Sequence, residues 1–393
     1  MEVLIQNGDR LSWISLDPHA LSRPSRGFDH RRFGYYPRAM NWLFVLALLL
    51  METPAPSVKR VEIKQGSACG KVGAVCRVAR VTQDGKEIFL RGIWGSSNRD
   101  IWVVGNGGLI LHFDGRTWRQ SIPPRSLDRV WGNRLSSDDV DRQLDAVWGS
   151  GPRDVWAAGS GGILHWNGKQ WSLSFAGRSP NAIWGSGPKD VWAAGFYSGI
   201  LHFDGSTWTI VKEKLEHCCG SVWGLGANDV WFLGGESTLL HFDGKAFSPI
   251  DLGLSQVVRS ARSSPRASQP SLDAIWGPHP KDLWIAGERG TMVHFDGKRW
   301  RPYRGLPSET AFGLPSGINA LHGAAPKTLW GVGDGVFRFD GKHWVKVVGK
   351  ALLAPKARLG PVEAVQLLTG VFVNPKAVWI CGADGSILHA RLR

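Results

Sequence analysis

The sequence lacks the motifs of the common enzyme chemistries. It contains no nucleophile elbow, phosphate-binding loop, HExxH pair or nucleotide-binding fingerprint. Its five cysteines form no Cys-x-x-Cys pair and no zinc-type spacing, which argues against a metal site. We therefore assign no catalytic residue, no metal ligand and no cofactor from the sequence.

Long apolar stretches are also scarce. Residues 42–51, WLFVLALLLM, are too few to span a bilayer, but they fit the apolar region of a secretory signal. Ala55-Pro56-Ser57 offers small residues for cleavage, whereas no lipoprotein-type cysteine follows the run. We expect export to the periplasm, the cell surface or the medium, with the segment either cleaved or kept as an anchor. The alternative is a buried segment in an ordered N-terminal extension.

Cysteine is rare enough to restrict the disulfide bonds. In an exported protein some pairing is expected, and an odd number of cysteines leaves one thiol over. Cys69 with Cys76 is a plausible local bridge, and Cys218 with Cys219 could form a strained vicinal one.

A repeated unit fills most of the chain. Its clearest copy, residues 182–208, reads AIWGSGPKDVWAAGFYSGILHFDGSTW. Short apolar segments alternate with turn formers, and the Asp204-Gly205 pair favours a tight turn because glycine accepts a positive φ. The segments are too short for stable helices and rich in strand formers. Four short antiparallel strands per unit are typical of a β-propeller blade.

Seven units can be counted from the second strand, which reads Trp-x-x-Gly each time. A tryptophan also marks the first strand of five units, and His322 and Gln366 take its place in the last two. The second-strand tryptophans are Trp102, Trp156, Trp192, Trp231, Trp284, Trp330 and Trp379.

The last unit has no fourth strand, and residues 81–88 read like the end of a repeat. We therefore predict an all-β fold: a single seven-bladed propeller of four-stranded antiparallel blades, closed by an N-terminal strand that covers both open edges. The predicted domains are a basic leader at 1–57 and a linker or start of the closing strand at 58–80. The propeller follows at 81–393.

The inserts all fall between the fourth strand of one unit and the first strand of the next. Up-and-down strand order places them on the same face as the loops after the second strands, so we name this the insert-bearing face. Long loops on a rigid scaffold are where binding usually occurs. The inserts are residues 119–143, 248–272, 301–318 and 345–363, and their basic candidate residues include Arg259, Arg262, Arg266, Lys356 and Arg358.

The loops after the second strands differ between units. The last four carry carboxylates, which could line the rim of the central channel and bind a cation or act as general acid and base. Exposed acids at loop tips are common, so solvated loops are the alternative. The candidate residues on these loops are Glu236, Glu288, Asp334 and Asp384, together with Tyr197 in the third unit.

Histidine recurs on the third strand of six units. A residue that nearly every blade carries points to a structural task, and we expect these histidines to form hydrogen bonds between strands or to the repeated aspartate of the first turn. The tryptophans likewise indicate core packing between blades, with stacking on glycans as the alternative. The six histidines are His112, His165, His202, His241, His294 and His389.

The repeat resembles several propeller families. Its Asp-Gly-x-x-Trp ending, as at residues 204–208, is similar to a shortened Asp-box of sialidase-like propellers. The run Trp-Gly…Asp-Val-Trp…His-Phe-Asp-Gly…Trp is similar to tectonin-type lectin repeats. Overall it most resembles the Trp-Gly-rich propeller repeats of secreted bacterial proteins, a Kelch-like or WD-like architecture. The catalytic Arg, Tyr and Glu constellation of sialidases cannot be mapped, since only four tyrosines exist.

These patterns favour an exported, non-enzymatic binding or scaffold module that acts through its insert-bearing face as a monomer. The alternatives are a glycan-binding lectin, or a glycan-acting hydrolase or lyase that uses the acids at the channel rim. The 47 Lys and Arg residues against 33 Asp and Glu give a formal charge of +14. The partner expected is a protein or an anionic glycan at a cell surface, rather than a nucleic acid.

Overall fold

The computed structural model has two compact units, Met1–Val58 and Lys59–Arg393, which we describe separately. It describes residues 2–7, 10–15, 61–66, 74–122, 142–213, 220–234, 238–253, 271–303, 306, 317–325, 328–348 and 367–392. In the first unit, β1 (Glu2–Asn7) pairs antiparallel with β2 (Arg10–Ser15). Among the described residues, no helix is both long and apolar enough to cross a membrane.

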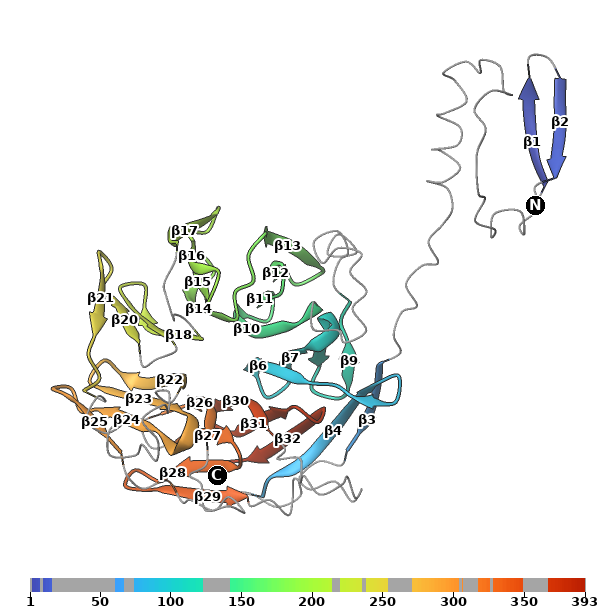
Figure 1. Ribbon diagram of the computed structural model, residues 1–393. Helices are drawn as coiled ribbons and strands as arrows, with labels where there is room; N and C mark the ends of the chain where they lie inside the picture. Colours follow the sequence, from blue (N-terminus) through green and yellow to red (C-terminus); the bar gives the residue numbers. More distant parts are fainter. Residues whose placement is uncertain are drawn as a thin grey trace, which may run out of the picture. The chain divides into compact units, whose positions relative to one another are not determined.

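The second unit is a seven-bladed β-propeller, as predicted (Figure 1). Each blade is an antiparallel sheet whose strands follow chain order from the channel outward. Six blades are continuous in sequence. The first three are β6 (Leu90–Ser97), β7 (Asp100–Gly105), β8 (Ile110–Phe113) and β9 (Trp118–Gln120); β10 (Leu144–Gly151), β11 (Asp154–Gly159), β12 (Gly162–Trp166) and β13 (Trp171–Ala176); and β14 (Ala182–Gly187), β15 (Asp190–Gly195), β16 (Gly199–Phe203) and β17 (Trp208–Lys212).

The next three blades repeat this order. Two short 3₁₀ turns, Asn106–Gly108 and Glu288–Gly290, follow the second strands of blades one and five. The strands are β18 (Ser221–Gly226), β19 (Asp229–Leu233), β20 (Leu239–Phe242) and β21 (Phe247–Ile250); β22 (Leu272–His279), β23 (Asp282–Gly287), β24 (Met292–Phe295) and β25 (Trp300–Pro302); and β26 (Ile318–Gly323), β27 (Leu329–Gly333), β28 (Val336–Phe339) and β29 (Trp344–Val348).

The seventh blade joins the two ends of the propeller. Its first three strands are β30 (Leu368–Asn374), β31 (Ala377–Gly382) and β32 (Ser386–Arg391), and β4 (Cys76–Gln83) pairs with β32 as the fourth. β3 (Val61–Gln65) then pairs with the outer edge of β4, and the short β5 (Lys86–Glu87) also pairs with β4. The predicted closure by an N-terminal strand is therefore confirmed.

Two details of that prediction were wrong. The closing strand is Cys76–Gln83, so it starts before the predicted residues 81–88 and ends at the Asp84-Gly85 turn, after which Lys86–Glu87 pairs back onto it. The first-strand position of blade seven belongs to Phe372, which stands opposite Trp379 as Trp94 stands opposite Trp102. Gln366, assigned there from the sequence, lies outside the described residues.

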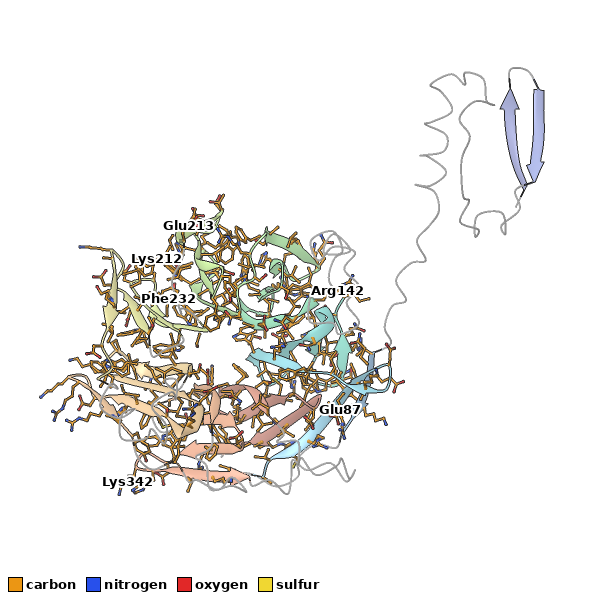
Figure 2. The ribbon with its side chains drawn as sticks, viewed as in Figure 1. Glu87, Arg142, Lys212, Glu213, Phe232 and Lys342 are labelled. Atoms are coloured by element: carbon orange, nitrogen blue, oxygen red, sulfur yellow. The ribbon has the colours of Figure 1, made fainter. Side chains whose placement is uncertain are left out.

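Neighbouring blades pack through the Trp-Gly pairs of their first strands. In four blades the glycine after the first-strand tryptophan or histidine leaves room for the tryptophan of the preceding blade. A Cβ on Gly185 would lie 2.6 Å from Cη2 of Trp148, and one on Gly149 would lie 2.7 Å from Cη2 of Trp94. The same contact joins Trp184 to blade four and Trp276 to blade six. Buried side chains such as Phe232 fill the space between blades, whereas Glu213 and Lys342 lie on the periphery (Figure 2).

Five of the six third-strand histidines bind the repeated aspartates, as predicted, whereas Ala377 takes the aspartate position in the blade of His389. In five blades the histidine Nε2 lies 2.6–2.7 Å from Oδ1 of the aspartate that begins the second strand. Each of these five rings also stacks on the second-strand tryptophan, with centroids 3.9–4.1 Å apart. In blades two, three and four the tryptophan Nε1 donates to the same aspartate oxygen. These contacts hold the second and third strands of a blade together.

The turn after the third strand explains the Asp-Gly pair. Asp204 Oδ1 accepts hydrogen bonds from the backbone N–H groups of Ser206 and Thr207, both at 2.8 Å. These donors lower the pKa of Asp204. Gly205 follows with a φ of +94°, a conformation that favours glycine. Asn167 makes the same two contacts in blade two, which is why asparagine can replace aspartate there.

Candidate functional site at the mouth of the channel

The direction of the strands defines the two ends of the channel. The innermost strand of each blade begins at the insert-bearing face, and the second strand returns to that face. In the first blade, for example, Leu90 at the start of β6 stands opposite Gly105 at the end of β7. The first residues of the innermost strands therefore surround the channel where the inserts and the loops after the second strands also lie.

A β-bulge occupies the start of the innermost strand in five blades. The register shifts there by one residue, for example between Leu90 and Gly92 and between Leu144 and Ala146. Bulges redirect a side chain and are frequent beside functional sites. The five bulged residues are all polar: Arg91, Asp145, Asp273, Asn319 and Thr369.

Blades three and four have Asn181 and Gly220 at the same position, three residues before the first-strand tryptophan. With the five bulged residues they form a set of seven, one from each blade, which we call the mouth ring. Its members differ in charge and size from blade to blade, in contrast to the repeated residues of the core. A set that varies at one structural position is suited to recognise an asymmetric ligand.

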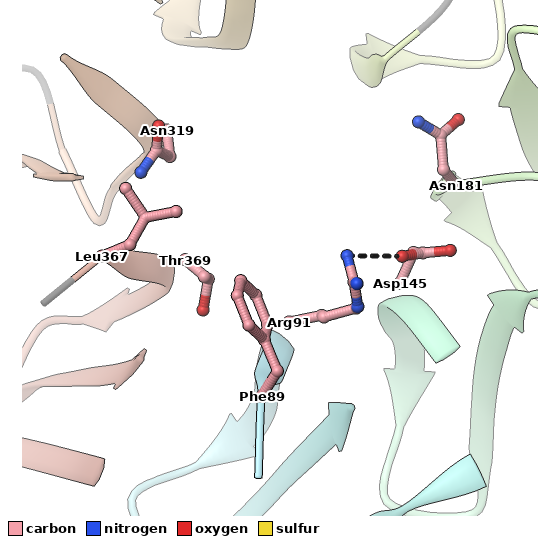
Figure 3. Close-up of a pocket in the computed structure, with 7 residues that line it drawn as sticks. All are labelled: Phe89, Arg91, Asp145, Asn181, Asn319, Leu367 and Thr369. Atoms are coloured by element: carbon pink, nitrogen blue, oxygen red, sulfur yellow. Dashed lines mark ion pairs between the residues drawn. The ribbon is translucent and has the colours of Figure 1, made fainter. Parts of the chain in front are cut away.

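Five members of the mouth ring line a cavity of about 260 Å³. Figure 3 shows their side chains converging on an open space from blades on opposite sides of the channel. Phe89 and Leu367, each two residues before a bulge, add apolar surface. The lining thus combines an ion pair, two amides, a hydroxyl and two apolar groups: Phe89, Arg91, Asp145, Asn181, Asn319, Leu367 and Thr369.

Arg91 is held on three sides. Its Nε donates to Oδ1 of Asn106 at 2.7 Å, and its Nη1 lies 3.2 Å from Oδ1 of Asp145. Its Cζ lies 4.7 Å from the ring centroid of Phe89, within the range of a cation–π contact. The guanidinium is therefore fixed before any ligand arrives, and the ion pair is drawn as a dashed line in Figure 3.

Burial acts on the two carboxylates of the mouth ring. Desolvation raises the pKa of Asp145, and the nearby Arg91 opposes that rise. Desolvation also raises the pKa of Asp273, which accepts a hydrogen bond from Ser271 and experiences the charge of Glu288. Both acids therefore gain from a ligand that donates hydrogen bonds.

Two further ring members, Asn319 and Thr369, are tied to the next blades. Asn319 Nδ2 donates to the carbonyl of Leu368 at 2.9 Å, and Thr369 Oγ1 donates to the carbonyl of Leu90 at 2.6 Å. These bonds connect blade six to blade seven, and blade seven to blade one. The mouth ring is consequently rigid across the closure of the propeller.

The acids predicted from the loops after the second strands differ in their surroundings. Glu288 is exposed, and Asp334 accepts a hydrogen bond from the backbone of Gly317 at 3.0 Å. Asp384 is 7% exposed and accepts two hydrogen bonds from Ser386, so its carboxylate is used within blade seven. None of these three lines the cavity. Glu236, like Arg259, Arg262, Arg266, Lys356 and Arg358, lies outside the described residues.

Large apolar side chains are exposed on the same face. Tyr197 is 94% exposed on the loop after β15, next to Phe196 at 46%, and Ile122 is 79% exposed where the first insert begins. Leu367, at 37%, stands at the mouth itself. Exposed apolar groups around a polar cavity are typical of a surface that binds a partner.

Two cysteines, Cys76 and Cys381, belong to the described part of the chain. No group of three or more His, Cys, Asp or Glu residues there could hold a metal ion. Cys381 is a buried free thiol whose pKa burial raises to about 12. Cys76 is disulfide-bonded. Its partner lies among Cys69, Cys218 and Cys219, outside the described residues, so the predicted Cys69–Cys76 bridge stays a prediction.

The mouth ring was missed from the sequence. Its signal was present, because the third residue before each first-strand tryptophan is variable and mostly polar in an otherwise apolar strand. In a regular strand the side chain of that residue would point to the same face of the sheet as the side chains two positions before and after it. Only the bulge shows that the side chain is redirected.

Comparisons with known proteins show the fold. No family model matches the chain, and no curated protein matches it. The solved structure "YCF48 bound to D1 peptide" is 14% identical with a TM-score of 0.55, and the match covers 81% of this chain and 96% of that one. A catalytically inactive virginiamycin B lyase from Staphylococcus aureus with Quinupristin is 10% identical with a TM-score of 0.58, covering 85% and 100%.

The WD40 repeats of RRP9 are similar at the same level. They are 11% identical, with a TM-score of 0.57, and the match covers 84% of this chain and 100% of that chain. These similarities extend over nearly the whole of each solved structure, so the chain shares the propeller architecture of all three. At such low identity they show the fold alone.

Proposed function

We propose that the protein is a binding module that holds a peptide segment of a protein partner at the mouth of its channel. The observation that carries this proposal is the mouth ring, in which redirected polar side chains from different blades line one cavity. Pockets with a few fixed polar groups and apolar walls are the usual form of a ligand site.

A peptide fits this site better than an anionic glycan. Arg91 already faces Asp145, so the described cavity offers no free positive charge for a sulfate or carboxylate. The exposed Phe196, Tyr197 and Ile122 offer apolar contacts beyond the mouth, as protein interfaces do. Among the structures of similar fold, YCF48 is described as bound to a peptide, which supports the same class of ligand here.

The basic inserts belong to the same proposal. Arg259, Arg262 and Arg266 in one insert and Lys356 and Arg358 in another would steer an acidic partner toward the mouth. Such steering weakens as salt screens the charges. We expect the association rate to fall with ionic strength, and charge reversal of these five residues to remove that dependence.

Export is part of the proposal as well. The apolar run at 42–51 has the length of a signal segment, and a disulfide at Cys76 suits an oxidising compartment. Residues 1–70 fused to a reporter that is active only after export should give activity. Replacing three leucines of the run by arginine should abolish it, and an inactive wild-type fusion would contradict export.

Gly220 provides the test of the binding site. A Cβ there would approach only the ring of Phe196, at 3.8 Å, so blade four tolerates a larger side chain at the mouth. Peptides selected by display against the full chain should bind wild type and Gly220→Ala equally. Gly220→Trp, which places a large side chain on the mouth ring, should weaken binding at least about tenfold. Equal binding by all three proteins would contradict the proposal.

A further inference from the structure

The Arg91–Asp145 pair determines which chemical group enters the cavity. Among the described residues, Nη2 of Arg91 and Oδ2 of Asp145 make no hydrogen bond or ion pair. One is a donor that never loses its proton, and the other belongs to a carboxylate. The ion pair therefore leaves one donor atom on Arg91 and one acceptor atom on Asp145 for a ligand, and both side chains are partly buried, at 28% and 15% exposed.

We infer that this pair selects a neutral carboxamide, the side chain of a glutamine or asparagine of the bound peptide. The inference rests on the proposed function. A carboxamide has a carbonyl to accept from Arg91 and an N–H to donate to Asp145. Asn181 and Asn319, elsewhere on the lining, offer further amide groups of the same kind.

Charge explains why the other polar side chains fit less well. A carboxylate on the ligand would meet Arg91 favourably but would lie against Asp145, and an ammonium group would have the opposite problem. Both oppositely charged partners are only partly exposed, so water screens these repulsions poorly. A neutral group with both a donor and an acceptor satisfies both atoms without adding charge, and a carboxamide carries the two on separate atoms.

Arg91 is fixed by contacts that do not depend on the ligand. Asn106 holds its Nε and Phe89 lies against its plane, so the donor is in place beforehand. Pre-organisation of this kind lowers the entropy lost on binding. A site built to hydrogen-bond both edges of a ligand group also rejects analogues that leave one edge unpaired.

The experiment uses three capped amino acids and the full chain. N-acetyl-glutamine N-methylamide, its glutamate analogue and its lysine analogue are compared by saturation-transfer NMR. Wild type should bind the glutamine probe at least about tenfold more tightly than the other two, the ratio of one satisfied hydrogen-bond pair. Absent binding of the glutamine probe, or equal binding of all three, overturns the inference.

Single substitutions should reverse the preference. R91Q leaves Asp145 alone and should favour the lysine probe, whereas D145N leaves Arg91 alone and should favour the glutamate probe. A purely structural role for the pair would not exchange these preferences. E213Q, which removes the ion pair with Arg178 near the outer edge of the same face, is the matched control and should leave the order unchanged.

The double variant R91Q/D145N keeps the test valid if a single variant does not fold. It leaves no unpaired charge and should bind all three probes with similar affinity, and a retained preference for glutamine would overturn the inference. The Gly220→Trp result separates the two proposals. If that variant still blocks selected peptides while no carboxamide preference is found, only the inference fails.

Discussion

Gly185 illustrates how single residues join the blades. Its missing side chain leaves room for Trp148 of the preceding blade and for the backbone carbonyl of Asp190. The Trp-Gly repeat is thus a contact between neighbours, in which the tryptophan of one blade covers the glycine of the next. This contact explains why the two residues recur together.

The first prediction compares two glycines of one strand. Gly185→Ala should lower the free energy of unfolding by about 1–3 kcal/mol, because the added methyl group would lie 2.6 Å from both the Asp190 oxygen and Cη2 of Trp148. Gly187→Ala, two residues on, meets nothing within 4 Å and is the control. Denaturant unfolding of both variants checks it, and equal stabilities would contradict the packing described.

His202 tests the hydrogen bonds inside a blade. It lies 2.7 Å from Asp190 and stacks on Trp192. His202→Ala should cost about 1–3 kcal/mol, because the aspartate loses a partner in a partly buried position. Peptide binding by the folded fraction should survive, since this network is at the opposite end of the blade from the mouth. A variant of wild-type stability that had lost binding would contradict the structural role.

His322 gives a prediction about pH. Burial lowers its pKa from 6.5 to about 4, and its Nδ1 accepts a hydrogen bond from the backbone N–H of Val373. Between pH 6.5 and pH 4 the unfolded state binds more protons than the folded state. The contribution of neutral, buried His322 to the free energy of unfolding is therefore complete above pH 6.5 and is lost as the pH falls toward 4. The loss amounts to about 3 kcal/mol for this residue.

Unfolding curves between pH 7 and pH 4 measure this effect. His322→Gln keeps an acceptor without a titrating ring, so its stability should fall less steeply over that range. His389, whose pKa burial also lowers to about 4, contributes a slope of the same sign in both proteins. Parallel pH profiles for wild type and His322→Gln would contradict the assignment.

At the scale of elements, β4 and β3 have different tasks. β4 completes the sheet of blade seven, whereas β3 adds a further strand and reaches blade one. Gln65 at the end of β3 donates from Nε2 to the carbonyl of Trp118 at 3.2 Å. β4 therefore closes the propeller, and β3 reinforces the junction.

Two internal deletions separate these tasks. Removing residues 59–73 takes away β3 and should lower the melting temperature moderately. Removing residues 59–83 takes away β4 as well, exposes the edge of β32, and should abolish cooperative unfolding. Circular dichroism melts distinguish the two, and closure by β4 would be refuted if the longer deletion melted like the shorter one.

The sequence predicted the repeated elements well and the exceptions poorly. Residues such as Trp192, Asp190 and His202 recur at fixed spacing because five blades use the same contact, so the number of blades, the strand order and the His–Asp contact were all foreseeable. Phe372 was missed because a long insert precedes it and its blade lacks the first-strand tryptophan. The side chain of Arg91 could not be placed, because its direction depends on a bulge that local sequence does not specify.

In the molecule as a whole, the residues repeated in the blades provide rigidity, and the residues that differ between blades provide chemical variety. Repeated contacts between blades build the propeller, and the non-repeated residues gather at one end of the channel. That end carries the cavity, the mouth ring and the exposed Tyr197 and Leu367. The central claim is that a peptide partner binds at this end.

Cross-linking tests that claim most directly. A display-selected peptide that carries a photoreactive group is bound to the full chain, irradiated and mapped by mass spectrometry. The account predicts adducts around the mouth, at Phe89, Leu367 or Tyr197, and their loss in Gly220→Trp. Adducts confined to the turns at the other end of the blades, such as Pro188 and Lys189, would contradict it.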